Sequence, residues 1–181
     1  MTIDQYIAEL RKQKKELAST KAVFLAASTA HADAVERIFT AGNATSGQDI
    51  GNYNKKDPIY VNPLDAPRGF APKGKNGKTT FKNGNKHKTR YFESYSDFRA
   101  NQGRRNDKVN LDLFGDLKSD FENSLVRISN TAFESAIRRE DNIDKALGNQ
   151  SRFNKAIFAA SDEERATFTD VLRFELRKIY G

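Results

Sequence analysis

The sequence predicts an α+β fold: a small antiparallel sheet packed by a C-terminal helix, with a long N-terminal helix and a long basic arm. Three patterns lead to this prediction. Apolar and polar residues alternate over residues 109–114, and two short β-like runs flank a corner at Asn130. Apolar residues recur every three or four positions over residues 3–38 and again over residues 161–180. Alternation is typical of a half-buried strand, whereas a recurrence every three or four residues is typical of an amphipathic helix.

The N-terminal helix begins with Thr2 and Gln5, which form a capping-box pattern. An uninterrupted helix to Thr40 is about 60 Å long at 1.5 Å per residue. That length leaves two alternatives: a helix pair with a bend near Ser19 or Ser28, or one helix whose end projects to meet neighbours. The apolar spacing passes through two lysines, which favours a helix only partly covered by its own domain. Its positions are Ile3, Ile7, Leu10, Lys14, Leu17, Lys21, Phe24, Ser28, His31, Val35 and Ile38.

Residues 51–90 form the basic arm, which follows small and turn-forming residues at 41–47. All four prolines lie in it, at positions 58, 63, 67 and 72. We expect short strands at 59–61 and 79–81, with turns at Asn76-Gly77 and Asn83-Gly84. The remainder is too rich in Lys, Gly and Asn to build its own core. We therefore expect residues 51–88 to be mobile in an isolated subunit and ordered in an assembly.

Residues 91–181 contain the predicted core. We expect a short helix capped by Ser94 or Ser96, with Tyr95, Phe98 and Arg99 on one side. The strand at 109–114 follows, then a helical turn around Leu117 and Phe121 and a hairpin around Asn130. Residues 141–147 form one or two helical turns that end at Gly148.

The last helix is the best marked element of the chain. Ser161 and Glu164 form a capping box, and further acidic residues lie in the first turn. Its expected buried face is Phe168, Val171, Leu172, Leu176 and Ile179. Arg173 falls on the opposite side.

Composition indicates a single domain over residues 1–181 with a small core. Hydrophobic residues make up 37% of the 181 residues and charged residues 30%. The net charge is +7, and residues 51–92 account for it with ten Lys and Arg against two Asp. Cysteine is absent, which excludes disulfides and thiolate metal ligands. No apolar run reaches membrane-spanning length and no signal peptide is recognisable, so we expect synthesis in a cytoplasm.

Each candidate catalytic or binding pattern in the sequence lacks a residue that its chemistry requires. Gly74 to Thr79 resembles a phosphate-binding loop, but the glycine that this loop requires is replaced by Pro72. His31 and His87 have no second ligand at metal-binding spacing. The carboxylates Asp112, Asp116 and Asp120 are interpreted as a solvated face. We therefore expect no enzymatic activity, cofactor or metal.

Two blocks of sequence carry a family resemblance. The first runs through Tyr95, Phe98, Arg99, Gln102-Gly103-Arg104, Val109, Leu111, Leu113, Gly115 and Leu117. The second contains Gly148, Arg152-Phe153, Ile157-Phe158, Ser161 and Glu164. Together they resemble the tail-completion or neck proteins of tailed bacteriophages, over roughly residues 91–180.

The resemblance implies a structural virion protein made in the host cytoplasm. It implies a homo-oligomeric ring at the head–tail joint, between portal or adaptor proteins and the tail tube or terminator, around the DNA channel. The arm is a departure from the family pattern, and three interpretations of it stay open: a solvated loop, a non-specific DNA contact and an assembly arm. The residues concerned are Lys55, Lys56, Arg68, Phe70, Lys73, Lys75, Lys78, Phe81, Lys82, Lys86, Lys88 and Arg90.

Overall fold

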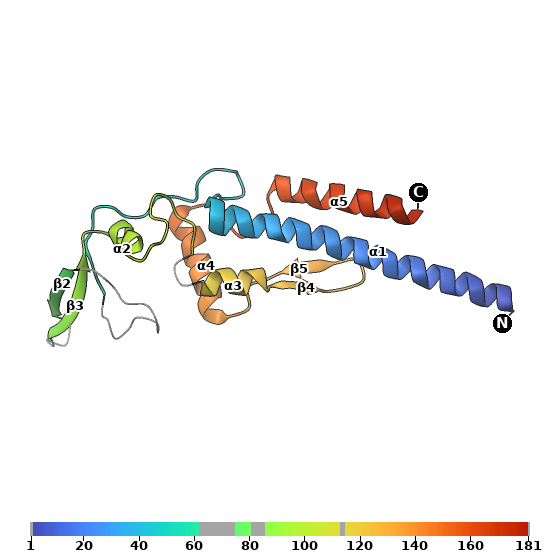
Figure 1. Cartoon of the computed structure of the whole chain (residues 1–181), viewed down its shortest axis with the longest axis horizontal. Helices are drawn as coiled ribbons and strands as arrows, with labels where there is room; N and C mark the ends of the chain where they lie inside the picture. Colours follow the sequence, from blue (N-terminus) through green and yellow to red (C-terminus); the bar gives the residue numbers. More distant parts are fainter. Residues whose placement is uncertain (1, 62–74, 81–85, 113–114, 181) are drawn as a thin grey trace.

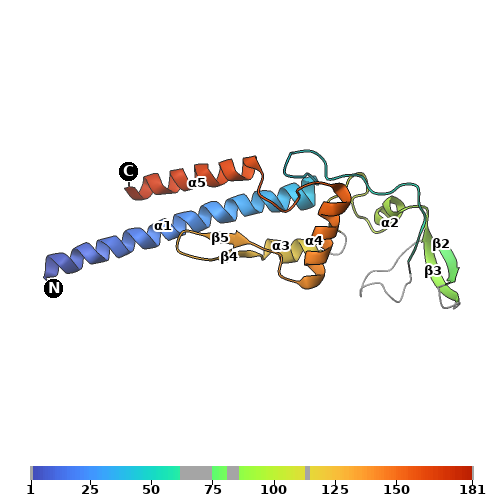
Figure 2. The same ribbon diagram turned by 180° about the vertical axis from the view of Figure 1, so that it is seen from behind.

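The computed structural model describes residues 2–61, 75–80, 86–112 and 115–180. The molecule is elongated, with the N-terminus at one end and a small sheet at the other (Figure 1). One long helix, α1, extends over most of the helical part, with α5 along one side and a hairpin along the other (Figures 1 and 2). The combination of helices and antiparallel sheets confirms the predicted α+β class.

Helix α1 (Ile3–Val35) is continuous and does not bend into a pair. The Thr2 hydroxyl accepts from the Gln5 amide, and the Thr2 amide donates to Gln5 Oε1, which completes the capping box. The hydroxyls of Ser19 and Thr29 donate to carbonyls in the preceding turn, so these residues stay helical. Of the two alternatives, the single projecting helix is correct.

The C-terminal end of α1 widens into a π-helical turn, η1 (Glu36–Ala41), and ends at Gly42. Gly42 has φ +75°, and a Cβ there would lie 2.4 Å from the carbonyl oxygen of Val109. Only glycine combines the left-handed conformation with so close a backbone approach.

The sequence predicted the last helix across one face of the sheet, with the N-terminal helix either beside it or projecting. Helix α5 (Asp162–Tyr180) packs along α1, so the two helices lie side by side. Its capping box is formed as predicted, because the Ser161 amide donates to Glu164 Oε2 and the Glu164 amide donates to Ser161 Oγ. Two small residues of α1, Ala22 and Ala26, are buried along this length. The predicted apolar face of α5 is half-buried rather than fully buried, and Arg173 is exposed.

Strands β4 (Leu125–Arg127) and β5 (Phe133–Ser135) form the predicted hairpin, with Val126 paired to Glu134. The strand predicted at residues 109–114 is not formed over 109–112, and residues 113 and 114 lie outside the described residues. Its alternation anticipated a wet face, yet Asn110 is buried together with Val109 because its side chain bonds within the protein. The neighbouring Leu111 has φ +54°, which is incompatible with a strand.

A second, three-stranded sheet has the antiparallel order β1-β3-β2. It comprises β1 (Ile59–Val61), β2 (Lys75–Thr80) and β3 (Lys86–Phe92). The strand at 59–61 is confirmed, whereas the turn predicted at Asn76-Gly77 is wrong because both residues pair with β3. Asn83-Gly84 and Phe81 lie outside the described residues. The expected mobility of the arm stays a prediction.

Three shorter helices complete the fold. Helix α2 (Tyr95–Asn101) is capped by the Ser94 hydroxyl as predicted, and α3 (Asp116–Glu122) contains the helical turn predicted around Leu117 and Phe121. Helix α4 (Glu140–Phe153) passes through Gly148 and ends at Asn154, whose φ is +49°. The predicted stop at Gly148 is wrong, because the left-handed cap is supplied six residues later by an asparagine.

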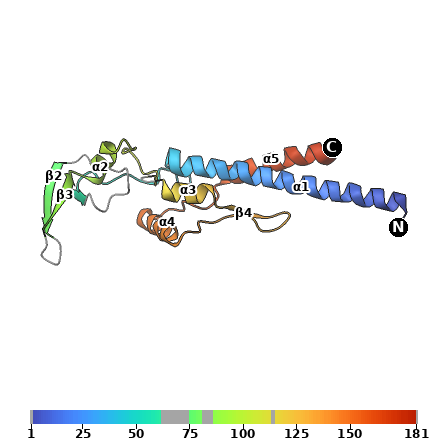
Figure 3. The same cartoon turned by 60° about the horizontal axis from the view of Figure 1, so that its bottom comes forward.

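The main hydrophobic core lies where the C-terminal end of α1 meets α3 and α4 (Figure 3). Phe39 and Phe121 have ring centroids 5.9 Å apart, and Phe121 and Phe158 have theirs 5.6 Å apart. Ile38 and Ile157 beside them are fully buried. The core is therefore small, as the composition predicted, and it contains a cluster of phenylalanine rings.

Candidate assembly surfaces

Among the described residues, little covers the N-terminal half of α1. Every residue from Thr2 to Leu17 is exposed, a length of about 22 Å of helix. The last turn of α5 reaches α1 through Tyr180, whose hydroxyl lies 2.7 Å from that of Ser19 and whose ring centre lies 5.3 Å from Lys15 Nζ. We define the uncovered stripe as Ile3, Ile7, Leu10, Lys14, Leu17, Lys21 and Phe24.

The apolar members of the uncovered stripe are strongly exposed. Ile3 is 79% accessible, Leu17 74% and Leu10 46%. Large apolar residues repeated along one helical face mark an interaction site more often than a solvated surface. The uncovered stripe is therefore the clearest candidate for a contact with another molecule.

The same helical register is covered further along α1. The His31 ring lies 5.0 Å from that of Phe121, and its Nε2 is 3.0 Å from the Phe121 carbonyl oxygen. Ile38 is completely buried. His31 is thus a packed residue, and one continuous register serves the chain's own core at one end and faces solvent at the other.

Between the two parts, the β4–β5 hairpin and α1 form an apolar groove of about 660 Å³. Its floor includes Leu17, Phe24 and Phe133, and the rings of Phe24 and Phe133 are 5.4 Å apart. Lys14, Lys21 and Arg127 line its rim, and no acidic residue lines it. We call this the hairpin groove.

A second cavity of about 540 Å³ lies between α1, the hairpin and α5. Alanines 27 and 30 form one wall, and Phe121, Phe158 and Phe168 contribute aromatic surface. Only a few polar groups, among them His31 and Arg165, reach it. Apolar surface is therefore available on both sides of α1.

Several candidate residues of the basic arm lie in the described part of the chain. Lys55 and Lys56 are exposed in the segment that leads into β1, and Arg90 lies in β3. Four lysines fall on the β2–β3 hairpin at the end of the molecule opposite the N-terminus: Lys75, Lys78, Lys86 and Lys88. The strand register pairs Lys78 with Lys88. Arg68, Phe70, Lys73, Phe81 and Lys82 lie outside the described residues.

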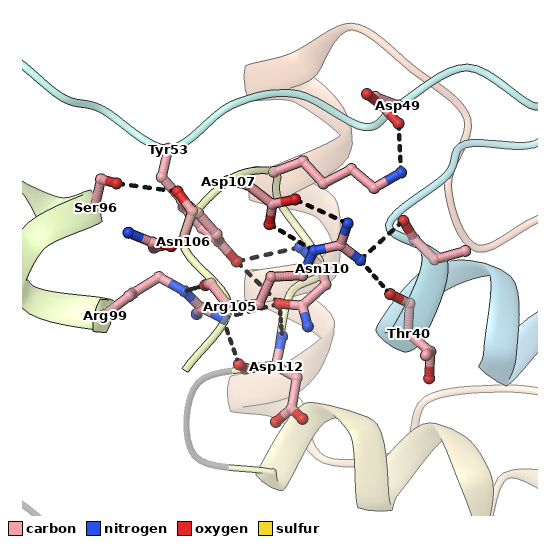
Figure 4. A network of polar contacts seen from close by, with 12 residues as sticks. Thr40, Asp49, Tyr53, Ser96, Arg99, Arg105, Asn106, Asp107, Asn110 and Asp112 are labelled. Carbon is pink, nitrogen blue, oxygen red and sulfur yellow. Dashed lines mark hydrogen bonds and ion pairs between the residues drawn. The ribbon is translucent and has the colours of Figure 1, made fainter. Parts of the chain in front are cut away.

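A buried polar node joins the sheet end to the helical body (Figure 4). Arg99 of α2 is 1% exposed, and its guanidinium lies 4.2 Å from the Tyr53 ring centre. It donates to the carbonyl oxygens of Arg105 and Asp112 and to Asn110 Oδ1. These contacts solvate the cation with dipoles, which a buried charge requires.

Asn110 connects this node to η1, at the end of the long helix. Its side-chain amide donates to the Phe39 carbonyl oxygen at 3.0 Å, while Oδ1 accepts from Arg99 and from the Tyr53 hydroxyl. Burial raises the pKa of the Tyr53 hydroxyl, the dominant cause being desolvation of the phenolate. The hydroxyl therefore stays a neutral donor in this network.

A second set of contacts surrounds the end of η1. The Arg105 guanidinium donates to the Thr40 carbonyl oxygen and to both oxygens of Asp107. The hydrogen bond between the Arg105 guanidinium and the Asp107 carboxylate holds the pKa of Asp107 well below its ordinary value and raises the pKa of Arg105. Lys108 donates to Asp49 Oδ1 at 2.7 Å. The loop from 103 to 112 is thereby attached to the end of the long helix.

The acidic residues at 112, 116 and 120 do not form a site together. Asp120 accepts from the Arg139 amide and the Asn142 side chain, whereas Asp116 is exposed. No group of three or more His, Cys, Asp or Glu able to hold a metal occurs among the described residues. Lys75 and Lys78, from the phosphate-loop comparison, lie in a strand with no helix after it.

The residues that sequence reasoning missed are the polar ones that connect elements. The node residues Asn110 and Tyr53 are distant in sequence, and no local pattern links them. Arg99 was expected on one side of a short helix, but its burial was not foreseen. The presence of Arg99 in the first block was the only signal.

Comparisons with known protein families, with curated proteins and with solved structures found no match. Within the described residues, no helix is both long and apolar enough to cross a lipid bilayer.

Proposed function

We propose that this chain is a non-catalytic assembly subunit, forming a ring at the head–tail joint of a tailed phage particle. The observation that carries the proposal is the uncovered stripe on α1. Ile3, Leu10 and Leu17 are large apolar residues that a monomer leaves exposed to water. A projecting helix of this kind gains stability when another chain covers it.

The two blocks that resemble neck proteins support this assignment through their structural roles. In the first block, Arg99 and Val109 are buried in and beside the polar node. In the second, Ile157 belongs to the core and Ser161 caps α5. Residues of both blocks maintain architecture, which suits a building block better than a catalyst.

The shape suits a subunit that meets a different neighbour at each end. The two ends of the molecule differ: an apolar helix projects at one and a lysine-bearing sheet lies at the other. Contacts between unlike surfaces of neighbouring copies form a ring when the rotation between neighbours closes. Portal or adaptor proteins and the tail tube or terminator are the proposed neighbours, and the virion is the proposed location.

The test is complementation of a phage that lacks this gene. The variant Ile7→Glu/Leu10→Glu places charges on the uncovered stripe without touching the core. We expect filled heads and separate tails that fail to join. The matched control, Ala8→Glu/Lys12→Glu, adds the same side chains away from the stripe and is expected to restore infectivity. Normal infectious particles from the stripe variant would refute the proposal.

A second candidate function is non-specific DNA binding through the β2–β3 hairpin. It is favoured by four lysines in one hairpin at an end of the molecule. Phosphate contacts weaken steeply as salt rises, because bound counterions are released. Binding of a random-sequence duplex that falls about a hundredfold between 50 and 200 mM salt would support this function.

A further inference from the structure

We infer that the uncovered stripe pairs with an acidic amphipathic helix of a different protein, in the manner of a coiled coil, and not with the same helix of a second copy. This inference rests on the proposed function for the use of the stripe, and it adds the chemistry of the partner. The argument depends on spacing, on two lysines and on the hairpin groove.

The spacing is that of a coiled-coil seam. Stripe positions 3, 7, 10, 14, 17, 21 and 24 alternate by four and three residues, which is the heptad pattern of inward-facing positions. The series extends through positions 28, 31, 35 and 38, which the chain's own domain covers. A partner helix laid on the N-terminal half would continue an existing packing face.

Two seam positions are occupied by lysine, at Lys14 and Lys21. In the described part of the chain neither ammonium has an ion-pair partner, and both groups are exposed on the rim of the hairpin groove. Arg127 on the same rim bonds to the Ser129 carbonyl oxygen and to Asn130, not to a carboxylate. The groove is thus apolar on its floor and cationic on its rim.

These lysines oppose pairing of the stripe with itself. In a parallel, in-register pair each seam residue faces its own counterpart, so Lys14 would meet Lys14 and Lys21 would meet Lys21. No member of the stripe is acidic, so an antiparallel arrangement of two stripes also provides no seam carboxylate. Like charges buried in a seam select against such a partner.

A helix with Glu or Asp seven residues apart meets both requirements. Lys14 and Lys21 are separated by two helical turns, about 10.5 Å along the axis. A partner with carboxylates at this spacing and apolar residues between them would neutralise both ammonium groups. Its apolar side chains would cover Leu10 and Leu17 and enter the hairpin groove.

The test uses two labelled synthetic peptides and the full-length protein. One peptide copies residues 3–25, and the other carries Lys14→Glu and Lys21→Glu in the same sequence. Fluorescence anisotropy is expected to show that the acidic peptide binds at least about tenfold more tightly, since two like-charge contacts become opposite-charge contacts. Equal affinity, tighter binding of the unchanged peptide, or binding of neither peptide would overturn the inference.

A reciprocal variant makes the test independent of peptide helicity. The protein variant Lys14→Glu/Lys21→Glu alters two exposed residues and should keep the circular dichroism of the parent. Its preference is expected to reverse, so that the unchanged, lysine-bearing peptide binds more tightly. A variant that keeps the parent's preference would show that the two positions do not face the partner.

Sedimentation tests the alternative occupant, a second copy. The parent protein is expected not to associate through α1, whereas Lys14→Leu/Lys21→Leu, which completes the apolar seam, is expected to self-associate. If the parent self-associates and Leu10→Glu abolishes this, a second copy is the partner and the inference is wrong.

Failure of this inference is distinguishable from failure of the proposed function. If Ile7→Glu/Leu10→Glu blocks head–tail joining while the peptides show no preference, the assembly function stands and the partner chemistry is wrong. If the peptides show the preference but that variant supports normal particles, the helix pairing stands and the head–tail function is wrong.

Discussion

Arg37 and Glu164, 127 positions apart in the chain, form an ion pair in which Nε and Oε1 lie 2.6 Å apart. The two side chains are only 9% and 4% exposed. The Arg37 guanidinium also donates to the carbonyl oxygens of Asn43, Ile157 and Ala159. One buried cation therefore attaches the start of α5 to the end of α1.

Removing the carboxylate of this pair is expected to destabilise the fold strongly. Glu164→Ala leaves the Arg37 charge buried without a counterion and also breaks the capping box with Ser161. We expect the free energy of unfolding to fall by about 3–5 kcal/mol, as measured by urea denaturation. Glu163→Ala, at the exposed neighbour, is the control and is expected to change it by less than about 0.5 kcal/mol. Similar values for both variants would contradict the role given to Glu164.

Gly42 provides a second stability test, with a matched control in the same loop. Gly42 and Gly47 have nearly equal φ, +75° and +76°, but only at Gly42 would a Cβ meet backbone, the Val109 carbonyl oxygen at 2.4 Å. Gly47→Ala is expected to cost about 1 kcal/mol for its left-handed conformation alone. Gly42→Ala should cost clearly more. Thermal melts that rank the two equally would show that the contact with Val109 relaxes freely.

Arg99 tests whether the polar node needs a planar guanidinium. Lysine at this position keeps the charge but cannot make the bonds to Arg105, Asn110 and Asp112 in one plane. We expect Arg99→Lys to lower the free energy of unfolding by about 2–4 kcal/mol, because buried acceptors lose their donors. Arg104→Lys, at a half-exposed neighbour, should be nearly neutral. If the Arg99→Lys protein is as stable as the parent, the planar guanidinium of Arg99 does not contribute to the stability of the fold.

Local signals in the sequence predicted where α1, α2 and α5 begin, because each N-terminal capping residue bonds within the first turn of its own helix. The β4–β5 hairpin was predictable for the same reason of proximity. Long-range packing was not. The alternation at Val109 resembled a strand because Asn110 is polar, yet a distant contact with Phe39 buries it.

The candidate site likewise has a part that the sequence predicts and a part that it does not. The exposed stripe follows from a spacing visible in the sequence, including the two lysines that dilute it. The sequence left open whether the N-terminal helix lies beside α5 or projects, because packing between two helices far apart in the chain has no local signal. In the Arg37–Glu164 ion pair, the capping box points to Glu164, but no local sequence pattern points to Arg37. Contacts between distant polar residues are selected by the fold as a whole, not by neighbouring residues.

Asp107 makes a prediction about pH. Its pKa is held well below the ordinary value by the hydrogen bond from Arg105. Because the folded pKa is the lower one, the pair stabilises the fold above about pH 4, where the unfolded carboxyl is ionised. That contribution is lost as pH falls through the folded pKa. Carbon-detected NMR titration should show Asp107 still ionised at pH 3, and urea denaturation should show Asp107→Asn differing from the parent at pH 6 but converging with it at low pH.

The last prediction concerns the basic arm. Deleting residues 55–88 is expected to leave a folded helical body, because no described residue of 55–88 belongs to the core around Ile38, Phe121 and Ile157. Asn54 stays attached to α2, because the Ser96 amide donates to its carbonyl oxygen at 3.0 Å, and a Gly-Ser linker joins it to Thr89. Circular dichroism should show retained helix, with a melting temperature within a few degrees of the parent.

In a phage that lacks the gene, this deletion is expected to leave filled heads and tails unjoined. The control variant keeps the arm and changes Lys75, Lys78, Lys86 and Lys88 to Gln. If the control restores joining while the deletion does not, the arm acts through contacts with neighbouring proteins, because its phosphate-binding charge has been reduced. If both fail, and the control also loses salt-dependent binding to duplex DNA, the lysines act on nucleic acid. Infectious particles from the deletion would show that the arm is a solvated loop with no part in assembly.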